Sequence, residues 1–201
     1  MDADCWFDPS CPYTWVTACW LQEVERVRDV RVRWHVMSLA VLNEGRDDDP
    51  EGDPEGDPEG WLWQPVRLFA VVADRHGQDA LRALYRAWGE AVHTRARWPE
   101  VGDLLAAAGL PPELAGVMGS DAHDGLVRAS HEAGIALVGT HVGTPVVAVP
   151  GPDGPVAWFG PVLSRVPRGE EAGRLWDGVT SVAATLGFHE VKGRPPEPPV
   201  T

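Results

Sequence analysis

The N-terminal residues show two patterns of hydrophobic positions in turn. The apolar run 5–7 ends in an Asp-Pro pair, which predicts a buried strand followed by a turn. Pro12 suits the first position of a helix, and apolar residues then recur at helical spacing to about Arg28. Over residues 30–36 apolar and polar side chains alternate, as in a strand with one buried face. The sequence therefore predicts a strand, a helix and a second strand in succession.

The later residues predict a helical stretch and then strands again. Residues 61–133 have mostly helical spacing, and we expect about four helices there. Strand character returns at 145–149, and a turn rich in proline and glycine separates it from 156–160, which predicts a hairpin. A final helix is expected over about 168–186. This order is that of an α/β thioredoxin fold, β-α-β and β-β-α, with an inserted all-helical domain.

The same patterns divide the chain into five parts. We expect the two halves of the thioredoxin fold at 1–45 and 134–192, and a helical lid domain at 61–133. Residues 46–60 contain a tandem triple repeat of Asp-Pro-Glu-Gly at 49–60, whose proline at every fourth residue excludes an α-helix. This acidic repeat predicts a solvated loop, with a lid over a neighbouring site as the alternative. The proline-rich residues 193–201 predict an extended tail.

Composition narrows the classes of partner. The formal net charge of −13 disfavours nucleic acid, because binding to phosphates needs a surface rich in lysine and arginine. No apolar stretch approaches the roughly 18 residues of a membrane span, so no membrane partner is expected. The start of the chain is acidic rather than basic, unlike an export signal, and the three cysteines do not suggest a disulfide framework. We expect a cytoplasmic protein with reduced thiols.

The stretch Phe-Asp-Pro-Ser-Cys-Pro-Tyr-Thr-Trp carries the main chemical signal. Cys11 precedes Pro12 and takes the N-cap of the predicted helix, where free N–H groups and the helix dipole should lower the thiol pKa. Thr14 replaces the second cysteine of a Cys-x-x-Cys pair; its hydroxyl can hydrogen-bond a thiolate but cannot resolve a mixed disulfide. Cys19 lies about 12 Å along the helix, too far for a bridge. We therefore predict a catalytic monothiol whose partner is an external low-molecular-weight thiol.

A second signal lies ahead of the predicted hairpin. In thioredoxin folds the residue before a cis proline presents its backbone to an extended thiol ligand, and Thr144-Pro145 stands in that topological place. We expect this peptide bond to be cis. None of the seven histidines pairs with another histidine or a cysteine at the spacing of a zinc site, so no metal is expected. His93 and His131 are open to two interpretations, acid or base near a pocket, or hydrogen-bonded helix residues.

Longer motifs point to a known family. They are Phe7-Asp8-Pro9 with Cys11-Pro12, residues 35–44, Ser120-Asp121-Ala122, Ser130-His131 with Ala133-Gly134, residues 142–145, and residues 159–165 with 167–173. Through them nearly all of the chain resembles the DsbA-like thioredoxin-fold proteins of actinobacteria typified by the mycothiol-dependent nitroreductases. These are akin to kappa-class glutathione transferases and 2-hydroxychromene-2-carboxylate isomerases. The family pattern reads Cys-Pro-Trp-Cys, whereas Tyr13 and Thr14 stand in its last two places here.

The resemblance implies a thioredoxin domain with a helical lid, mycothiol as the thiol co-substrate and a small hydrophobic substrate between the two domains. It implies that Cys11 is the reactive thiol, that Asn43 faces the active site and that Thr144-Pro145 forms the cis-proline loop. We expect catalysis to involve Cys11 and Thr14. The expected contacts to mycothiol are Pro12, Tyr13, Asn43, Gly143, Thr144 and Pro145, and those to the substrate are Trp15, Trp61 and Trp63.

Three functions remain open on these residues. The first is an oxidoreductase-like enzyme that uses mycothiol to reduce or transform a small organic molecule. The second is a mycothiol-dependent isomerase or S-transferase that acts by reversible thiol addition to an activated double bond. The third is a non-catalytic small-molecule-binding protein that retains the fold. A homodimer is compatible with these features and is not required by them.

Overall fold

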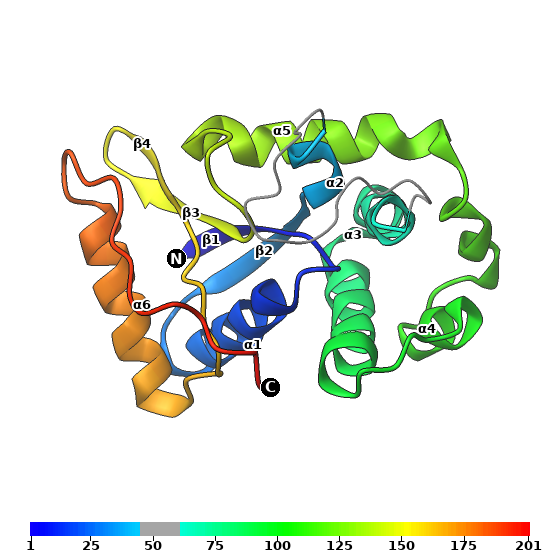
Figure 1. Cartoon of the computed structure of the whole chain (residues 1–201), viewed down its shortest axis with the longest axis horizontal. Coiled ribbons are helices and arrows are strands. Elements are labelled where there is room, and N and C mark those ends of the chain that lie inside the picture. Colours follow the sequence, from blue (N-terminus) through cyan, green and yellow to red (C-terminus); the bar gives the residue numbers. More distant parts are fainter. Residues whose placement is uncertain (45–60) are drawn as a thin grey trace.

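The computed structural model describes residues 1–44 and 61–201 (Figure 1), so the predicted acidic loop at 46–60 lies outside the described residues. The elements along the described chain are β1 (Asp2–Phe7), α1 (Pro12–Val27), β2 (Arg31–Val36), α2 (Leu39–Leu42), α3 (Trp63–Gly89), the π-helical turn η1 (Glu90–Thr94), α4 (Val101–Ala107), the short 3-10 helices η2 (Pro112–Val117) and η3 (Asp121–His123), α5 (Asp124–Val138), β3 (Val146–Gly151), β4 (Gly154–Phe159) and α6 (Gly169–Ala183).

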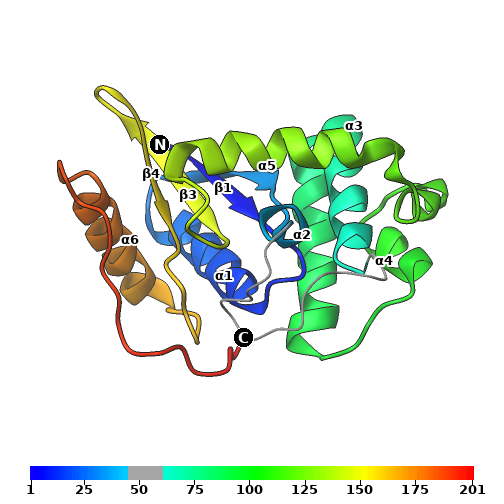
Figure 2. The ribbon, with the colours of Figure 1, turned by 45° about the horizontal axis from the view of Figure 1, so that its top comes forward.

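The described strands form one sheet in the order β2-β1-β3-β4. β1 pairs in parallel with β2 and antiparallel with β3, and β3 and β4 form the expected hairpin. Side chains alternate along β1, so that Cys5 and Phe7 enter the main core while Trp6 packs on the opposite face with Ile135 of α5. Helices α1 and α6 cover one face of the sheet and α5 crosses the other (Figures 1 and 2). This is the thioredoxin topology that the sequence predicted.

The edge strand β2 has its free backbone groups occupied by side chains from neighbouring helices. The Gln78 side chain of α3 accepts from the Trp34 N–H at 2.7 Å and donates to the Trp34 carbonyl at 2.9 Å. Glu25 of α1 accepts from the Val32 N–H at 2.8 Å. An uncovered edge is a template for pairing with another chain, and these contacts cover it. They also attach the helical insert to the sheet.

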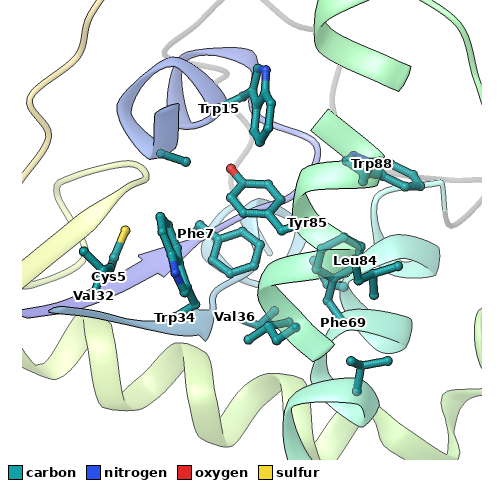
Figure 3. Packing of buried hydrophobic residues seen from close by; sticks show 14 of the residues in the cluster. Cys5, Phe7, Trp15, Val32, Trp34, Val36, Phe69, Leu84, Tyr85 and Trp88 are labelled. Carbon is teal, nitrogen blue, oxygen red and sulfur yellow. The ribbon is translucent and has the colours of Figure 1, made fainter. Parts of the chain in front are cut away.

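An aromatic cluster joins the insert to the thioredoxin half (Figure 3). The Tyr85 ring of α3 stacks on Phe7 at the end of β1, with ring centroids 3.9 Å apart. Trp15 of α1 meets the edge of the same tyrosine at 5.3 Å, and only 3% of Trp15 is exposed. Trp15 also lies against Gly89, where an added Cβ would be 2.2 Å from its ring. Helix α3 can approach α1 this closely because residue 89 has no side chain.

Helix α5 belongs to both parts of the molecule. The expected end of the insert at residue 133 falls inside this helix, which runs on to Val138. At Gly134 a Cβ would meet the Trp6 ring at 2.7 Å, so the second half of α5 lies directly on the sheet. Helix α3 is itself kinked at Gly77, whose φ of 77° is a left-handed conformation that favours glycine. Within the two described ranges, no helix is both long enough and apolar enough to span a membrane.

Replacing Gly89 by alanine tests this junction. Because Trp15 is buried and cannot rotate away, we expect Gly89→Ala to lower the free energy of unfolding by about 1–3 kcal/mol through overpacking. Gly178→Ala is the matched control, since nothing lies within 4 Å of a Cβ at this position in α6. The control should be neutral or stabilising by up to about 1 kcal/mol. Urea unfolding measures both; equal midpoints for the two variants would contradict the close packing of α1 on α3.

Candidate functional site

Cys11 lies at the N-terminal end of α1, as the sequence predicted. Its backbone is extended, with φ −82° and ψ 117°, and its sulfur accepts a hydrogen bond from the Thr14 N–H at 3.5 Å. The Cys11 N–H donates to the Asp8 carbonyl at 3.2 Å, which closes the turn between β1 and the helix. Pro12 starts the helix, where its missing N–H leaves no bond unmade. The thiol is thus the capping group of this helix and is only partly buried.

The expectation of a lowered pKa at Cys11 is wrong for this structure. Burial raises the pKa of the Cys11 thiol to about 11, and the negative charge of Asp8 adds to the rise. Hydrogen bonds from the side chain and backbone of Thr14 act in the opposite direction but do not outweigh burial. The sequence showed the helix end that favours a thiolate, but it could not show how much protein would surround the sulfur. Cys11 is therefore a protonated thiol at neutral pH.

The cis-proline loop meets the first turn of α1. The Thr144–Pro145 peptide bond is cis, as expected. The Thr14 hydroxyl donates to the Thr144 hydroxyl oxygen at 3.3 Å, and the Asp8 N–H donates to the same oxygen at 3.2 Å. Thr144 is 5% exposed, and Gly143 beside it is partly exposed. Two of the residues predicted to act together, Thr14 and Thr144, are therefore in direct contact.

Asp8 is a site residue that the sequence reasoning missed. Its carboxylate is fully buried and accepts from the Ser10 N–H and from the Leu39 N–H, both at 2.7 Å. The Leu39 contact fixes the start of α2, the helix that ends at Asn43. Burial raises the pKa of Asp8 to about 6, so the group is charged at neutral pH. Its position at the end of an apolar run was the available signal, because a carboxylate there must find donors when it is buried.

The loop before Cys11 is also held from the helical insert. The Pro9 carbonyl accepts from the Trp88 indole N–H and lies 2.8 Å from His93 Nε2. A carbonyl oxygen can only accept, so Nε2 carries the proton in this bond. Burial lowers the pKa of His93 and favours the neutral ring. His131 has a different place, since its Nδ1 accepts from the Ser38 N–H at 3.3 Å in the buried region beneath α2. Of the two histidines, His93 is the one that contacts the Cys11 loop.

The three tryptophans predicted to contact substrate lie in different environments. Trp15 is a buried core residue, so its assignment to an open pocket is corrected: helical spacing could not reveal that α3 would cover it. Trp61 is 52% exposed and meets the equally exposed Trp98 edge to face at 6.2 Å. Trp63 instead lies beneath the guanidinium groups of Arg67 and Arg128, each 5.2 Å from its ring. Trp98 is thus an exposed aromatic that the sequence reasoning did not select.

Tyr13 and Asn43, both expected to bind the co-substrate, are partly exposed and point to different contacts. The Tyr13 hydroxyl donates to the Glu197 carbonyl at 3.3 Å. Asn43 is the C-cap of α2, and its backbone N–H donates to the Leu39 carbonyl.

All three cysteines of the chain are free thiols. Burial raises the pKa of Cys5 far above its usual range and that of Cys19 to about 11.

A groove of about 830 Å³ lies between α1, α3 and α4, lined by residues that include Gln22, Arg82, Arg86 and Glu90. Its lining does not include Cys11 or Thr144, so this groove is separate from the thiol site. In the part of the chain that the structure describes, no three or more His, Cys, Asp or Glu residues are grouped to hold a metal ion.

Residues 10–193 match the family described as Rv2466c-like, mycothiol-dependent nitroreductase Rv2466c. The chain belongs to this family. The match begins one residue before Cys11 and includes the cis-proline loop, so both parts of the candidate site lie within it. The chain is therefore identified as a thiol-dependent enzyme of oxidoreductase type.

Three individual proteins are also similar to this chain. The Mycobacterium tuberculosis protein Rv2286c is 29% identical over 200 residues, which cover 96% of this chain and 81% of that protein. The probable DsbA oxidoreductase SCO1869 from Streptomyces coelicolor is 18% identical with a TM-score of 0.56, over 96% of this chain and 100% of that one. The cytosolic disulfide reductase DsbM from Pseudomonas aeruginosa, in a structure with GSH, is 15% identical with a TM-score of 0.55, over 90% and 100%. These structures confirm the DsbA-like thioredoxin fold.

The pH dependence of Cys11 alkylation tests the electrostatics of the site. Because only the thiolate reacts and the pKa is about 11, the rate with iodoacetamide should rise about tenfold per pH unit between pH 7 and pH 10. Mass spectrometry of chymotryptic peptides separates this rate from that of Cys19, because Tyr13 and Trp15 lie between the two cysteines. A rate that levels off by pH 8 would show that the helix end dominates over burial.

The same measurement on Asp8→Asn isolates the contribution of the buried carboxylate. Removing its charge should lower the apparent pKa of Cys11, since that charge raises it. Asp4→Asn is the matched control on the preceding strand β1, where the carboxylate pairs with Arg33 and His35 instead. The control should leave the Cys11 profile unchanged.

Proposed function

We propose that the protein is a monothiol reductase that uses mycothiol to reduce a small hydrophobic organic molecule, with Cys11 as the reacting thiol. The observation that carries the proposal is the capping position of Cys11 on α1, one helical turn from the Thr14–Thr144 contact with the cis-proline loop. The family match supports mycothiol as the thiol. The three free thiols support a reducing compartment such as the cytoplasm.

The proposed reaction begins when Cys11 loses its proton and its sulfur adds to an electrophilic centre of the substrate, such as a quinone carbon. The substrate takes up that electron pair and a proton from solvent. A mycothiol thiolate then attacks the Cys11 sulfur, the sulfur–substrate bond breaks, and the reduced substrate leaves with the bonding pair and a proton. Cys11 remains in a mixed disulfide, which a second mycothiol thiolate displaces. In total the substrate gains two electrons and two protons, and two mycothiol molecules become one disulfide.

Thr14 determines that both thiols must come from outside. At this helical position a cysteine would attack the mixed disulfide on Cys11, and threonine cannot. Its N–H and side chain instead favour the Cys11 thiolate, which partly offsets the burial of the sulfur. We assign the backbone of Gly143 and Thr144 to the bound co-substrate, because the residue before a cis proline pairs with an extended thiol ligand. Asn43 and Tyr13 complete this proposed site.

We assign the substrate to the side of the site formed by the helical insert. His93 and Trp88 bind the Pro9 carbonyl next to Cys11, and Trp88 also contacts Trp98 with ring centroids 5.1 Å apart. Trp98 and Trp61 then present two exposed indoles. Aromatic rings offer a large contact area to a flat apolar ligand. The proposed substrate is therefore a small aromatic or quinone-like molecule.

The raised pKa of Cys11 favours a second candidate function. A protonated thiol is a poor nucleophile but can donate a hydrogen bond to the thiolate of a bound mycothiol. In that case mycothiol itself would add to an activated double bond, and elimination or transfer would follow without net oxidation. This is the isomerase or S-transferase chemistry that the sequence also allowed.

Turnover of Cys11 variants separates these two functions. We expect Cys11→Ser and Cys11→Ala both to lose at least about 100-fold in the rate of quinone reduction by mycothiol, because covalent catalysis needs the sulfur. Cys19→Ser is the control and should keep the wild-type rate. The readout is the amount of mycothiol consumed, with two thiols oxidised for each molecule reduced.

A different pattern would support the second candidate. If Cys11→Ser keeps most of the rate while Cys11→Ala loses it, the group at residue 11 acts as a hydrogen-bond donor, since a hydroxyl can replace a thiol in that role. Product formed without net thiol consumption would then identify isomerisation. Full activity in both variants would contradict any direct role for Cys11.

A further inference from the structure

Residues 194–201 lie past the last residue of the family match and are attached to the body of the protein rather than extended away from it. The Val200 N–H donates to the Ser164 carbonyl at 2.8 Å, and the Glu197 N–H donates to the Ser164 hydroxyl at 2.9 Å. Arg165 and Val200 form a parallel β-bridge. The segment is therefore held along the loop that follows β4, as a short added strand would be. We call residues 195–201 the strap.

The strap has two further contacts, one to Tyr13 at the Cys11 end of α1 and one to Thr94 in η1. The Tyr13 hydroxyl donates to the Glu197 carbonyl, and Tyr13 follows Cys11 by two residues. The Thr201 hydroxyl lies 2.8 Å from the Thr94 hydroxyl, which also accepts from the Trp15 indole N–H. Figure 2 shows this red segment passing the start of α1.

These contacts place the strap across one side of the thiol site. His93, the neighbour of Thr94, binds the carbonyl of Pro9, which precedes Cys11 by two residues as Tyr13 follows it by two. The four steps from Glu197 to Thr201 span at most about 14 Å in an extended chain. Two of the intervening residues are the prolines 198 and 199, which limit the conformations that the strap loses on docking. The strap thus connects the thioredoxin half, through Tyr13 and Ser164, to the helical insert, through Thr94.

We propose that the strap determines substrate size: it forms a side wall of the entrance that admits small thiols and small organic molecules to Cys11 and excludes polypeptide disulfides. A polypeptide bound in extended form beside Thr144 must continue across the surface next to the reacting sulfur. The strap occupies part of that surface beside Tyr13. This inference rests on the proposed role of Cys11 as the reacting thiol and specifies the class of substrate it can reach.

Two maleimides of different size, both of which react with the Cys11 thiol, test in the full chain whether the strap excludes large molecules. N-ethylmaleimide is the small probe, and a maleimide on a polyethylene glycol chain is the large one. The loosened variant is Ser164→Ala with Thr201→Val, which removes one hydrogen bond at each end of the strap. The rate at Cys11 is the loss of its unmodified peptide in mass spectrometry. Thr185→Val is the control, since it removes an exposed hydroxyl bond to the Ser181 carbonyl at the C-terminal end of α6.

A locked variant provides the opposite change. The Thr94 and Thr201 hydroxyl oxygens are 2.8 Å apart, so Thr94→Cys with Thr201→Cys brings two sulfurs within bridging distance. We expect loosening to raise the rate of the large probe about tenfold, as the loss of two hydrogen bonds predicts, and that of the small probe less than about twofold. Oxidising the locked variant should lower the large-probe rate, and reduction should restore it.

If loosening and locking change the modification rates of both probes equally, or change neither rate, the proposed role of the strap is wrong. The role of Cys11 would be unaffected by that result. If Cys11 does not react with N-ethylmaleimide in any variant, the proposed function is contradicted, and the proposed role of the strap fails with it.

Discussion

The packing of Tyr85 between Phe7 and Trp15 is the contact on which the rest of the structure depends. It brings helix α3 of the insert against the end of β1 and the first turns of α1 (Figure 3). Gly89 permits this approach by leaving space for the Trp15 ring. Once α3 is in place, Trp88 and His93 reach the carbonyl of Pro9, two residues before the thiol. The helical insert is thus part of the thiol site and not an appended lid alone.

Two opposing effects set the electrostatics of the site. The helix end and the Thr14 N–H favour a charged sulfur, as in any cysteine at such a position. The surrounding protein and the carboxylate of Asp8 oppose it, and burial is the larger effect. The Asp8 carboxylate also holds the turn of Cys11 and the start of α2 together. The carboxylate that orients the thiol loop therefore also raises the pKa of Cys11 and disfavours its thiolate.

Local sequence signals predicted the fold well and the environment of the site poorly. The Cys-Pro start of α1 and the alternation in β2 depend on nearby residues, so they could be read from the chain. The cis proline at residue 145 was predicted from its place in the order of the elements. Element ends shifted slightly: β1 begins at Asp2 and α6 ends at Ala183. The burial of Trp15 depends on α3, which is distant in sequence. The raised pKa of Cys11 depends on how much protein surrounds the sulfur, which the local sequence does not show. Nothing in a proline-rich segment indicates where it will dock, so the attachment of residues 195–201 was also not predictable.

The central claim is that Cys11 reacts without an internal partner, and the fate of its mixed disulfide tests that claim most directly. After incubation with the disulfide of mycothiol, the intact mass of the wild-type protein should show one mycothiol attached at Cys11, and added mycothiol should remove it. In Thr14→Cys the adduct should instead disappear without added thiol, because the introduced sulfur resolves it as an internal disulfide. Loss of the adduct from the wild-type protein, with a disulfide between Cys11 and Cys5 or Cys19, would contradict the account.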